Sequence, residues 1–286
     1  MALLDVVNLS FSYPRRVVFE EISLSLTAGE FIGFLGPNGS GKSTFLKNIL
    51  GFLTPRAGKV LFAGPASSGG SAAVPSRELS HKERARRLAF VPQGFKLVVA
   101  FTVEDMVLMG RLPHLKDRWA GYSGEDRQKV RAVMEALGID SMADRPVSSL
   151  SGGEFQKVII ARCLVQEGDI ILLDEATSGL DLNHSIEIME LMRRKADEED
   201  KIILAVLHDL NLASHYCDRI FLLKNGRLRY QGRPADVLSA AVVEEIYGIR
   251  AEVRTDEYGC PFVLPRRAAK KPTMATAMTT EALHVL

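Results

Sequence analysis

Glycines, a lysine and three hydroxyl residues lie close together near the N-terminus, with a spacing suited to holding an anion. They fit the pattern G-x-x-x-x-G-K-[ST] at every defined position. The glycines let successive N–H groups point into one concavity, while the lysine can reach β- and γ-phosphates and the serine can ligate Mg²⁺. The stretch predicts a nucleoside triphosphate site, against the simpler alternative of a glycine-rich turn. Its residues are Gly36, Pro37, Asn38, Gly39, Ser40, Gly41, Lys42, Ser43 and Thr44.

Two carboxylates follow a run of four apolar residues, 170–173, that is typical of a buried strand. Beside a phosphate loop, Asp174 would hold Mg²⁺ directly or through water, together with Ser43. Glu175 would orient or deprotonate an attacking water. The alternative is an ordinary acidic boundary between a strand and a loop.

A third stretch consists of Ser151, Gly152, Gly153 and Glu154, and it leads into an apolar helical pattern over 154–165. A serine and two glycines at a helix start can bind an anion through free N–H groups. Taken alone, the stretch is equally well explained as a helix N-cap.

The composition is that of a globular chain without a strongly charged partner. The 286 residues are 47% hydrophobic and 25% charged, and 36 Lys+Arg against 35 Asp+Glu leave a net charge of +1. This balance argues against a nucleic-acid-binding surface. Three cysteines without metal-ligand spacing indicate a reduced, cytosolic setting. The longest apolar runs are too short to cross a bilayer, so any membrane role would come through a partner.

The elements that would position these residues alternate between strands and helices. Residues 30–35 predict a buried strand before the phosphate loop, and the apolar residues after it predict a helix. Residues 3–28 resemble an antiparallel piece, and residues 102–165 are helical in pattern. Later strands at 169–173 and 202–207 alternate with helices at 183–199 and 210–217, and residues 220–230 form a hairpin around Asn225-Gly226. The pattern predicts an α/β sheet with a helical insertion.

Two segments carry weaker patterns. Residues 64–76 are rich in Gly, Ser, Ala and Pro and predict a mobile loop. Beyond Gly248, residues 251–255 and 262–264 predict a small strand pair, and the last twenty or so residues a loose tail.

Taken in order, the three chemical stretches resemble the ATPase subunits of ATP-binding cassette (ABC) transporters. Four further positions match that family's pattern. Tyr13 resembles the aromatic residue that stacks on adenine, and Gln93 the glutamine that contacts Mg²⁺ and water. Asp181, in Ser178-Gly-Leu-Asp181, resembles the D-loop, and His208 after a strand matches the switch histidine. Four other histidines, His81, His114, His184 and His215, and all three cysteines are expected to be structural.

The resemblance covers residues 3–250 and implies an architecture. It is a P-loop NTPase (RecA-like) core with an N-terminal antiparallel β subdomain and a helical subdomain inserted at about 95–165. Residues 1–250 would form the cassette, and 251–286 a short extension and tail. The cofactors implied are ATP and Mg²⁺, with Lys42, Gln93, Glu175 and His208 catalytic.

In this family two cassettes pair head to tail, so that Ser151 to Glu154 of one copy would complete the phosphate site of the other. Two positions depart from the family pattern: Ala176 replaces the proline that usually follows the acidic pair, and Phe155 replaces a basic residue. Neither is a phosphate-contacting position, so activity is still expected.

Flanking stretches, including 107–114, 180–184, 205–211 and 245–248, resemble the importer group for iron-siderophores, haem and cobalamin. That likeness implies two permease subunits, an extracytoplasmic substrate-binding protein and a place on the cytoplasmic face of the cell membrane. The permease would dock near Phe95, Phe101 and the helix from Val103, unless those aromatics pack internally. Import of zinc, manganese, molybdate or tungstate, export, and a soluble role in translation or DNA repair are the alternatives.

Overall fold

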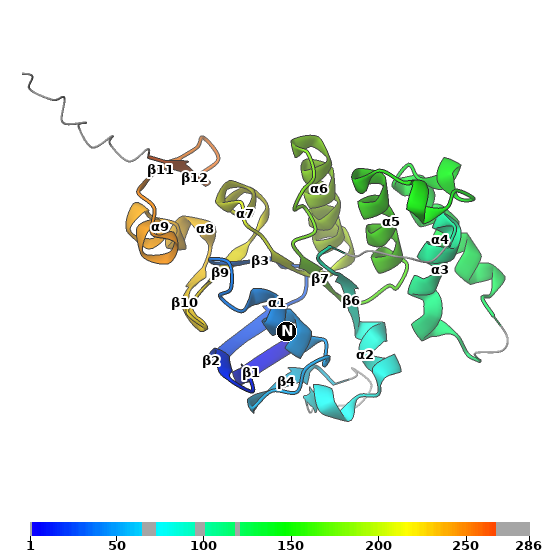
Figure 1. Ribbon diagram of the computed structural model, residues 1–286, viewed down its shortest axis with the longest axis horizontal. Coiled ribbons are helices and arrows are strands. Elements are labelled where there is room, and N and C mark those ends of the chain that lie inside the picture. Colours follow the sequence, from blue (N-terminus) through cyan, green and yellow to red (C-terminus); the bar gives the residue numbers. More distant parts are fainter. Residues whose placement is uncertain (1, 65–72, 95–100, 118–120, 267–286) are drawn as a thin grey trace, which may run out of the picture.

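A six-stranded sheet lies at the centre of the computed structural model, which describes residues 2–64, 73–94, 101–117 and 121–266 (Figure 1). Neighbouring strands pair in parallel, except that the edge strand β10 runs antiparallel to β9. Every residue is buried in three of its four inner strands, β3, β8 and β7, as expected for a parallel sheet covered on both faces. The spatial order is β10 (Arg227–Gly232), β9 (Arg219–Lys224), β3 (Phe31–Leu35), β8 (Ile202–Val206), β7 (Ile170–Asp174) and β6 (Leu88–Val91).

A second, antiparallel sheet is built mostly from the N-terminal residues, as the sequence predicts. Its two longest strands, β1 and β2, are paired and are connected by a tight turn between Tyr13 and Arg16. The order is β2 (Arg16–Thr27), β1 (Ala2–Tyr13), β4 (Ala57–Phe62) and β5 (Val74–Pro75). A third sheet pairs β11 (Ala251–Thr255) with β12 (Pro261–Pro265), at the predicted place near the C-terminus.

The period-2 alternation of strand β3 divides the hydrophobic core into two layers. Ile32 and Phe34 point toward the antiparallel sheet and the helix that follows the phosphate loop. Phe31 and Leu35 point the other way, into a core shared with the remaining helices. The central sheet is therefore covered by a β-rich layer on one face and by helices on the other.

Four of the helices begin at a reciprocal side-chain cap, including the one expected at Thr102. Ser80, Thr102, Ser123 and Ser151 each form a capping box, in which the N-cap side chain and the third helical residue exchange hydrogen bonds. The α-helices are α1 (Lys42–Ile49), α2 (His81–Arg87), α3 (Val103–Leu108), α4 (Gly124–Ala136), α5 (Gly152–Leu164), α6 (Leu182–Glu199), α7 (Leu210–Tyr216), α8 (Pro234–Val237) and α9 (Ala240–Tyr247). Short 3₁₀ turns are η2 (Ser76–Glu78), η3 (Met109–His114), η4 (Asp140–Met142) and η5 (Val147–Ser149).

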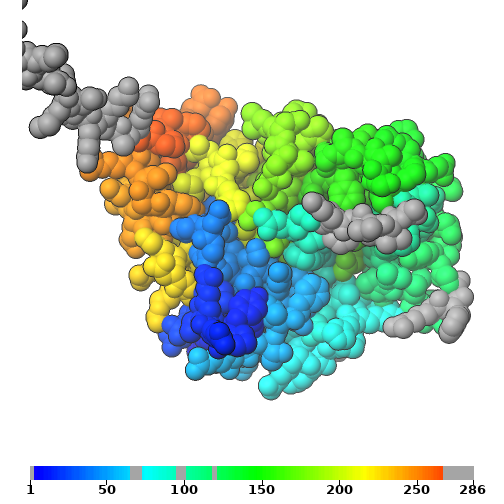
Figure 2. Space-filling model, in the orientation of Figure 1, coloured from blue at the N-terminus to red at the C-terminus, as the bar shows by residue number. Residues whose placement is uncertain are grey.

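The C-terminal strand pair packs on helix α7. In Figure 2 the orange and red atoms of this strand pair lie against yellow atoms of the segment that includes α7. Asn211 on α7 fixes the contact by a double hydrogen bond: its Nδ2 donates to the Val263 carbonyl, and its Oδ1 accepts from the Val263 N–H. The two segments are thus held in a defined register.

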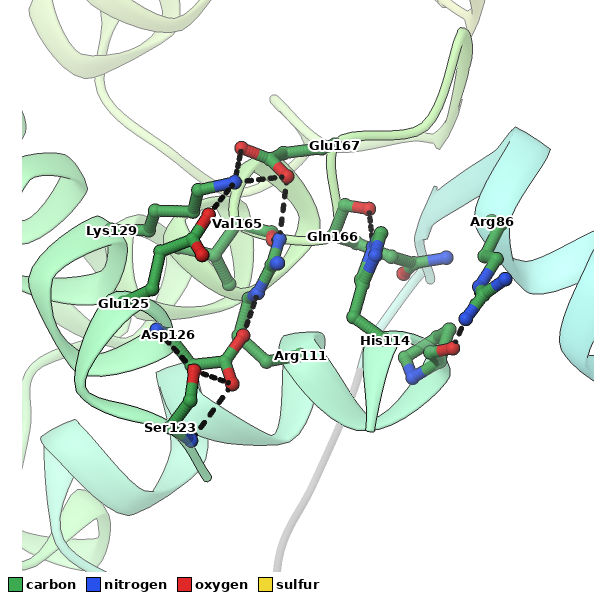
Figure 3. Close-up of polar contacts among 11 residues, drawn as sticks. Arg86, Arg111, His114, Ser123, Glu125, Asp126, Lys129, Val165, Gln166 and Glu167 are labelled. Carbon is green, nitrogen blue, oxygen red and sulfur yellow. Dashed lines mark hydrogen bonds and ion pairs between the residues drawn. The ribbon is translucent and has the colours of Figure 1, made fainter. Parts of the chain in front are cut away.

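Arg111 joins three parts of the helical region. Its Nε donates to Asp126 on α4 at 2.8 Å, and its Nη1 donates to the Val165 carbonyl and to Glu167, both just after α5. Lys129 also contacts Glu167. The Arg111 side chain is only 4% exposed, and Figure 3 shows its guanidinium between the two carboxylates. These contacts tie η3 and α4 to the segment that leads into strand β7.

Three expectations need correction or fall outside the description. The expected loop at 64–76 ends too late, because Val74–Pro75 pair with β4 and η2 follows; residues 65–72 lie outside the described part. Of the residues expected at the permease docking surface, Phe101 packs against the core and Val103 is fully buried. Phe95 lies outside the described residues. None of the described helices is both long and apolar enough to span a membrane.

Candidate nucleotide site

The phosphate loop connects β3 to α1 and needs glycine at several positions. Gly36, Gly39 and Gly41 have φ of 144°, 75° and 110°, where residues with a Cβ are strained. At Gly36 the neighbouring strand also leaves no room, since a Cβ would lie 2.1 Å from the Leu223 carbonyl oxygen. At Gly36 the loop therefore lies directly against β9.

Lys42 begins helix α1 and is held inside the loop. Its Nζ donates to the carbonyls of Gly36 at 2.7 Å and Pro37 at 3.1 Å. The side chain is 5% exposed, and burial lowers the pKa of the ammonium, while Glu175 and Asp174 act in the opposite direction. A buried cation at a helix N-terminus is a strong attractor for phosphate.

Ser43 and Asp174 meet across the sheet, as expected for a shared metal site. The Ser43 hydroxyl donates to Asp174 Oδ1 at 2.8 Å. Burial raises the pKa of Asp174, the Ser43 hydrogen bond lowers it, and the neighbouring Glu175 charge raises it further. A hydroxyl and a carboxylate oxygen are ligands that Mg²⁺ accepts, so the pair fits that ion.

Two further predicted catalytic residues, Gln93 and His208, contact the Glu175 carboxylate. Gln93, just after β6, donates from Nε2 to Glu175 Oε2 at 2.5 Å. His208, two residues beyond β8, places Nε2 2.7 Å from Glu175 Oε1. Glu175 itself has φ of 53°, a left-handed conformation that turns its side chain out at the end of β7. Residues 93, 175 and 208 are thus brought together by the carboxyl ends of three adjacent strands.

A cleft of about 480 Å³ lies beside the phosphate loop, between it and strand β2. Its lining includes Arg16 and Val17, which the sequence did not single out, and Arg16 donates to the Gly39 carbonyl at 3.4 Å. Tyr13 stands at the end of β1, opposite Arg16, and is 45% exposed, although it does not itself line the cleft. Within the described residues, Ser40 Oγ is buried without a hydrogen-bond partner. This orphaned hydroxyl inside the loop fits a phosphate oxygen.

Tyr247, at the end of α9, also reaches the phosphate loop. Its hydroxyl lies near the Gly36 N–H, and burial raises its pKa to about 12 despite that contact. In the described part of the chain, the hydroxyl has no hydrogen bond of ordinary geometry. The sequence offered 245–248 only as a resemblance, and nothing in its pattern placed Tyr247 beside Gly36.

The Ser-Gly-Gly-Glu stretch and the D-loop lie at other helix starts. Ser151 caps α5, donates its N–H to Glu154 at 2.7 Å, and is exposed, as is Gly152. Asp181 caps α6 and accepts from the N–H and ring of His184. Gly153 lies close to the same His184 ring. Among the described contacts, none joins the stretch 151–154 to the phosphate loop of its own chain.

A phosphate loop beside a strand that ends in two carboxylates defines a P-loop nucleoside triphosphatase. Residues 19–178 match the ABC transporter family, more than half of the chain, and the chain therefore belongs to that family. It is an ATP-binding, ATP-hydrolysing cassette of the transport-coupled kind.

Relatives and solved structures agree with this membership over nearly the full length. The chain is 36% identical to the probable siderophore transport system ATP-binding protein YusV of Bacillus subtilis, covering 98% of each chain. It is 39% identical to the hemin import ATP-binding protein HmuV of Pseudomonas entomophila, over 92% of this chain and all of that one. A structure described as a metal-chelate type ABC transporter in an inward-facing conformation matches with a TM-score of 0.79 and 27% identity, over 94% of this chain and 99% of the other.

Proposed function

We propose that this chain is the ATPase subunit of an importer for an iron chelate (siderophore), haem or cobalamin. ATP hydrolysis in this proposal rests on one observation: Gln93 and His208 both contact Glu175, next to the Ser43–Asp174 pair. The named activities of YusV and HmuV support the cargo class. Residues 1–250 would form the cassette, with the helical subdomain at about 95–165.

Glu175 acts as the general base in this proposal. One carboxylate oxygen takes a proton from water, whose oxygen then bonds to the γ-phosphorus as the bond to the β-phosphate oxygen breaks. Gln93 and His208 each contact a different oxygen of this carboxylate, so both position it. Lys42 and the loop amides stabilise the charge on the phosphates.

Ser43, Asp174 and Gln93 would hold Mg²⁺. When bound, the ion supplies positive charge to the β- and γ-phosphate oxygens. An ion at this place would also lower the pKa of Asp174, because an adjacent positive charge favours the carboxylate.

The catalytic site is completed by a second copy of the chain. Ser151 and Gly152 are exposed at the N-terminus of α5, and they make no contact with their own phosphate loop in the described structure. In a head-to-tail pair they would cover the γ-phosphate bound by the partner. ATP would then close the pair, and hydrolysis would open it.

Permease subunits would dock in a groove between α1, α2, β6 and η3. The groove has a volume of about 380 Å³, and its lining combines apolar side chains, including Phe52, Phe90 and Leu112, with basic ones such as Arg84. Phe52 is 66% exposed and Leu112 53% exposed, which is unusual for such large apolar residues. A helix with an apolar face, supplied by a permease at the cytoplasmic face of the cell membrane, fits this groove. The extracytoplasmic substrate-binding protein would act through that permease.

The Glu175→Gln variant tests the catalytic assignment. It keeps the size and shape of the side chain but removes the base, so ATP turnover should fall by roughly a hundredfold or more. ATP binding should persist, and ATP-dependent dimerisation should become stable enough to detect by light scattering. Glu198→Gln, an exposed acid on α6, is the matched control and should leave turnover unchanged. Wild-type turnover in Glu175→Gln would reject the assignment.

A further inference from the structure

We propose that the C-terminal hairpin and helix α7 together form a binding site for a divalent transition-metal ion such as Zn²⁺. The ligands are His215 near the end of α7, and Asp256 and Cys260 in the turn between β11 and β12. The nucleotide site uses none of these residues, so the inference is independent of the proposed function.

The three side chains already lie close to the arrangement that a metal requires. One ligand atom from each lies within 4.8 Å of the other two. Bonds of about 2.0–2.3 Å at tetrahedral angles would bring such atoms to roughly 3.3–3.8 Å. His215 and Asp256 are exposed and Cys260 is partly exposed, so small side-chain rotations can close the difference without moving the core.

The backbone around this site is fixed before any ion binds. The two hydrogen bonds between Asn211 and Val263 hold β12 against α7, and His215 lies four residues after Asn211 in the same helix. Residues four apart share one helix face, so these hydrogen bonds hold the hairpin on the side of α7 that carries the His215 imidazole. The ligands therefore come from two elements held in a set register.

The hairpin turn itself is organised by Asp256. Its Oδ1 accepts the N–H groups of Tyr258 at 2.9 Å and Cys260 at 2.8 Å. These bonds orient the carboxylate toward Cys260 and leave Oδ2 available as a ligand. A carboxylate whose position is set by hydrogen bonds is the arrangement that supports metal ligation elsewhere.

The donor set selects the class of ion. A thiolate, an imidazole and a carboxylate suit Zn²⁺, Fe²⁺ or Co²⁺, whereas Mg²⁺ and Ca²⁺ prefer oxygen ligands alone. Three protein ligands leave a fourth position for water. Such an ion would link the hairpin to α7, the helix that starts two residues after His208.

Cobalt is a suitable probe because a thiolate–Co²⁺ bond gives a charge-transfer absorption that oxygen ligands do not. The chain offers one accessible thiol among the described residues: Cys163 and Cys217 are buried, and burial raises the pKa of both, that of Cys163 to about 12. We expect the reduced, untagged full chain to show this absorption with one equivalent of Co²⁺. Zn²⁺ should remove it by competition and should protect Cys260 from alkylation.

Variants assign the ligands. Cys260→Ser should abolish the absorption, and His215→Ala and Asp256→Asn should each weaken Zn²⁺ binding by roughly tenfold or more. Asp256→Asn keeps an oxygen for the two turn N–H groups, so the hairpin should remain folded. Glu257→Gln is the matched control at the next position, and His284→Ala tests the tail histidine; both should bind normally. Absence of the absorption in the wild-type chain, or its persistence in Cys260→Ser, would overturn the proposal.

Discussion

Two groups beside the phosphate loop have pKa values shifted in opposite directions, and both shifts have burial as their largest cause. Burial lowers the pKa of the Lys42 ammonium, and burial raises the pKa of the Asp174 carboxyl. In each case the charged form is disfavoured by lost solvation. Charged phosphates and a metal cation would supply the compensating charges, so the site is built to gain stability from its ligands.

At the residue scale, Gly36→Ala should impair both the fold and the site. The new Cβ would lie 2.1 Å from the Leu223 oxygen, at a φ of 144°. We expect a loss of stability of about 2–4 kcal/mol and at least roughly tenfold weaker ATP binding, because strand β9 cannot move without disturbing the sheet. Thermal unfolding and binding of a fluorescent ATP analogue measure the two effects.

Gly248→Ala separates steric overlap from backbone strain. Gly248 has a φ of 72°, but a Cβ there would meet nothing within 4 Å. This variant should lose only about 1 kcal/mol and should bind ATP normally. Equal effects in the two variants would contradict the close approach of Gly36 to β9.

At the scale of elements, the attachment of the helical region depends on an ion network that the sequence did not reveal. Arg111 is buried between Asp126 and Glu167, which lie 15 and 56 residues away from it. A buried arginine is tolerated because it donates to a carbonyl and to two carboxylates. Removing one of those partners should therefore be costly.

Asp126→Asn tests this network through its pH dependence. Burial raises the pKa of Asp126, but hydrogen bonds from Arg111 and Ser123 outweigh it and lower that pKa to about 2. The unfolded value is about 3.9, so the carboxylate contributes at most about 2.5 kcal/mol, fully present above about pH 5 and lost as the pH falls toward 2. The variant should lose about 2 kcal/mol at pH 7, and the difference from wild type should shrink at pH 3.5.

Urea unfolding at pH 7, 5 and 3.5 measures that difference. Glu125→Gln is the control, because its side chain is 75% exposed and pairs with Lys129 at the surface. It should change stability by less than about 0.5 kcal/mol at each pH. A constant difference between wild type and Asp126→Asn would show that the carboxylate charge is not what the network uses.

The fold class was predictable because local patterns and motif context agree with the final structure. The strand before the loop, the capping residues and the Asn225-Gly226 turn each specify a local conformation. Contacts between distant residues left no such pattern. Arg16 near Gly39, Tyr247 near Gly36 and the Arg111 network depend on how the elements pack, which a single sequence does not record. The roles of the site residues stay predictions until variants are measured.

At the scale of the whole molecule, the apolar groove predicts where a membrane partner binds. Leu112→Glu places a charge among Phe52, Phe90 and their neighbours. We expect co-purification with the permease subunits from membranes to fall by roughly tenfold or more, with ATP binding by the isolated chain unchanged. Ile249→Glu, at another apolar residue that is 43% exposed, should have no effect on co-purification. Equal recovery of Leu112→Glu and wild type would place the docking surface elsewhere.

A second copy completing the site also leads to a test, because Gly152 can be changed without disturbing its own chain. A Cβ at Gly152 would meet nothing within 4 Å, and acids are favourable in the first turn of a helix. Gly152→Asp should therefore fold normally but place a negative charge where the partner's phosphate would lie. Gly124→Asp is the matched control, since Gly124 follows a capping serine in the same way and is equally open.

Mixing two inactive variants distinguishes action across the pair from action within one chain. Lys42→Ala disables the loop, and Gly152→Asp disables the Ser-Gly-Gly-Glu stretch, so each variant alone should lack turnover. In a mixed head-to-tail pair, the intact loop of one chain meets the intact stretch of the other, and one of two sites is whole. Random mixing makes half of the pairs mixed, so turnover should return to about a quarter of wild type. If the stretch served its own chain, every chain would keep its defect and the mixture would stay inactive.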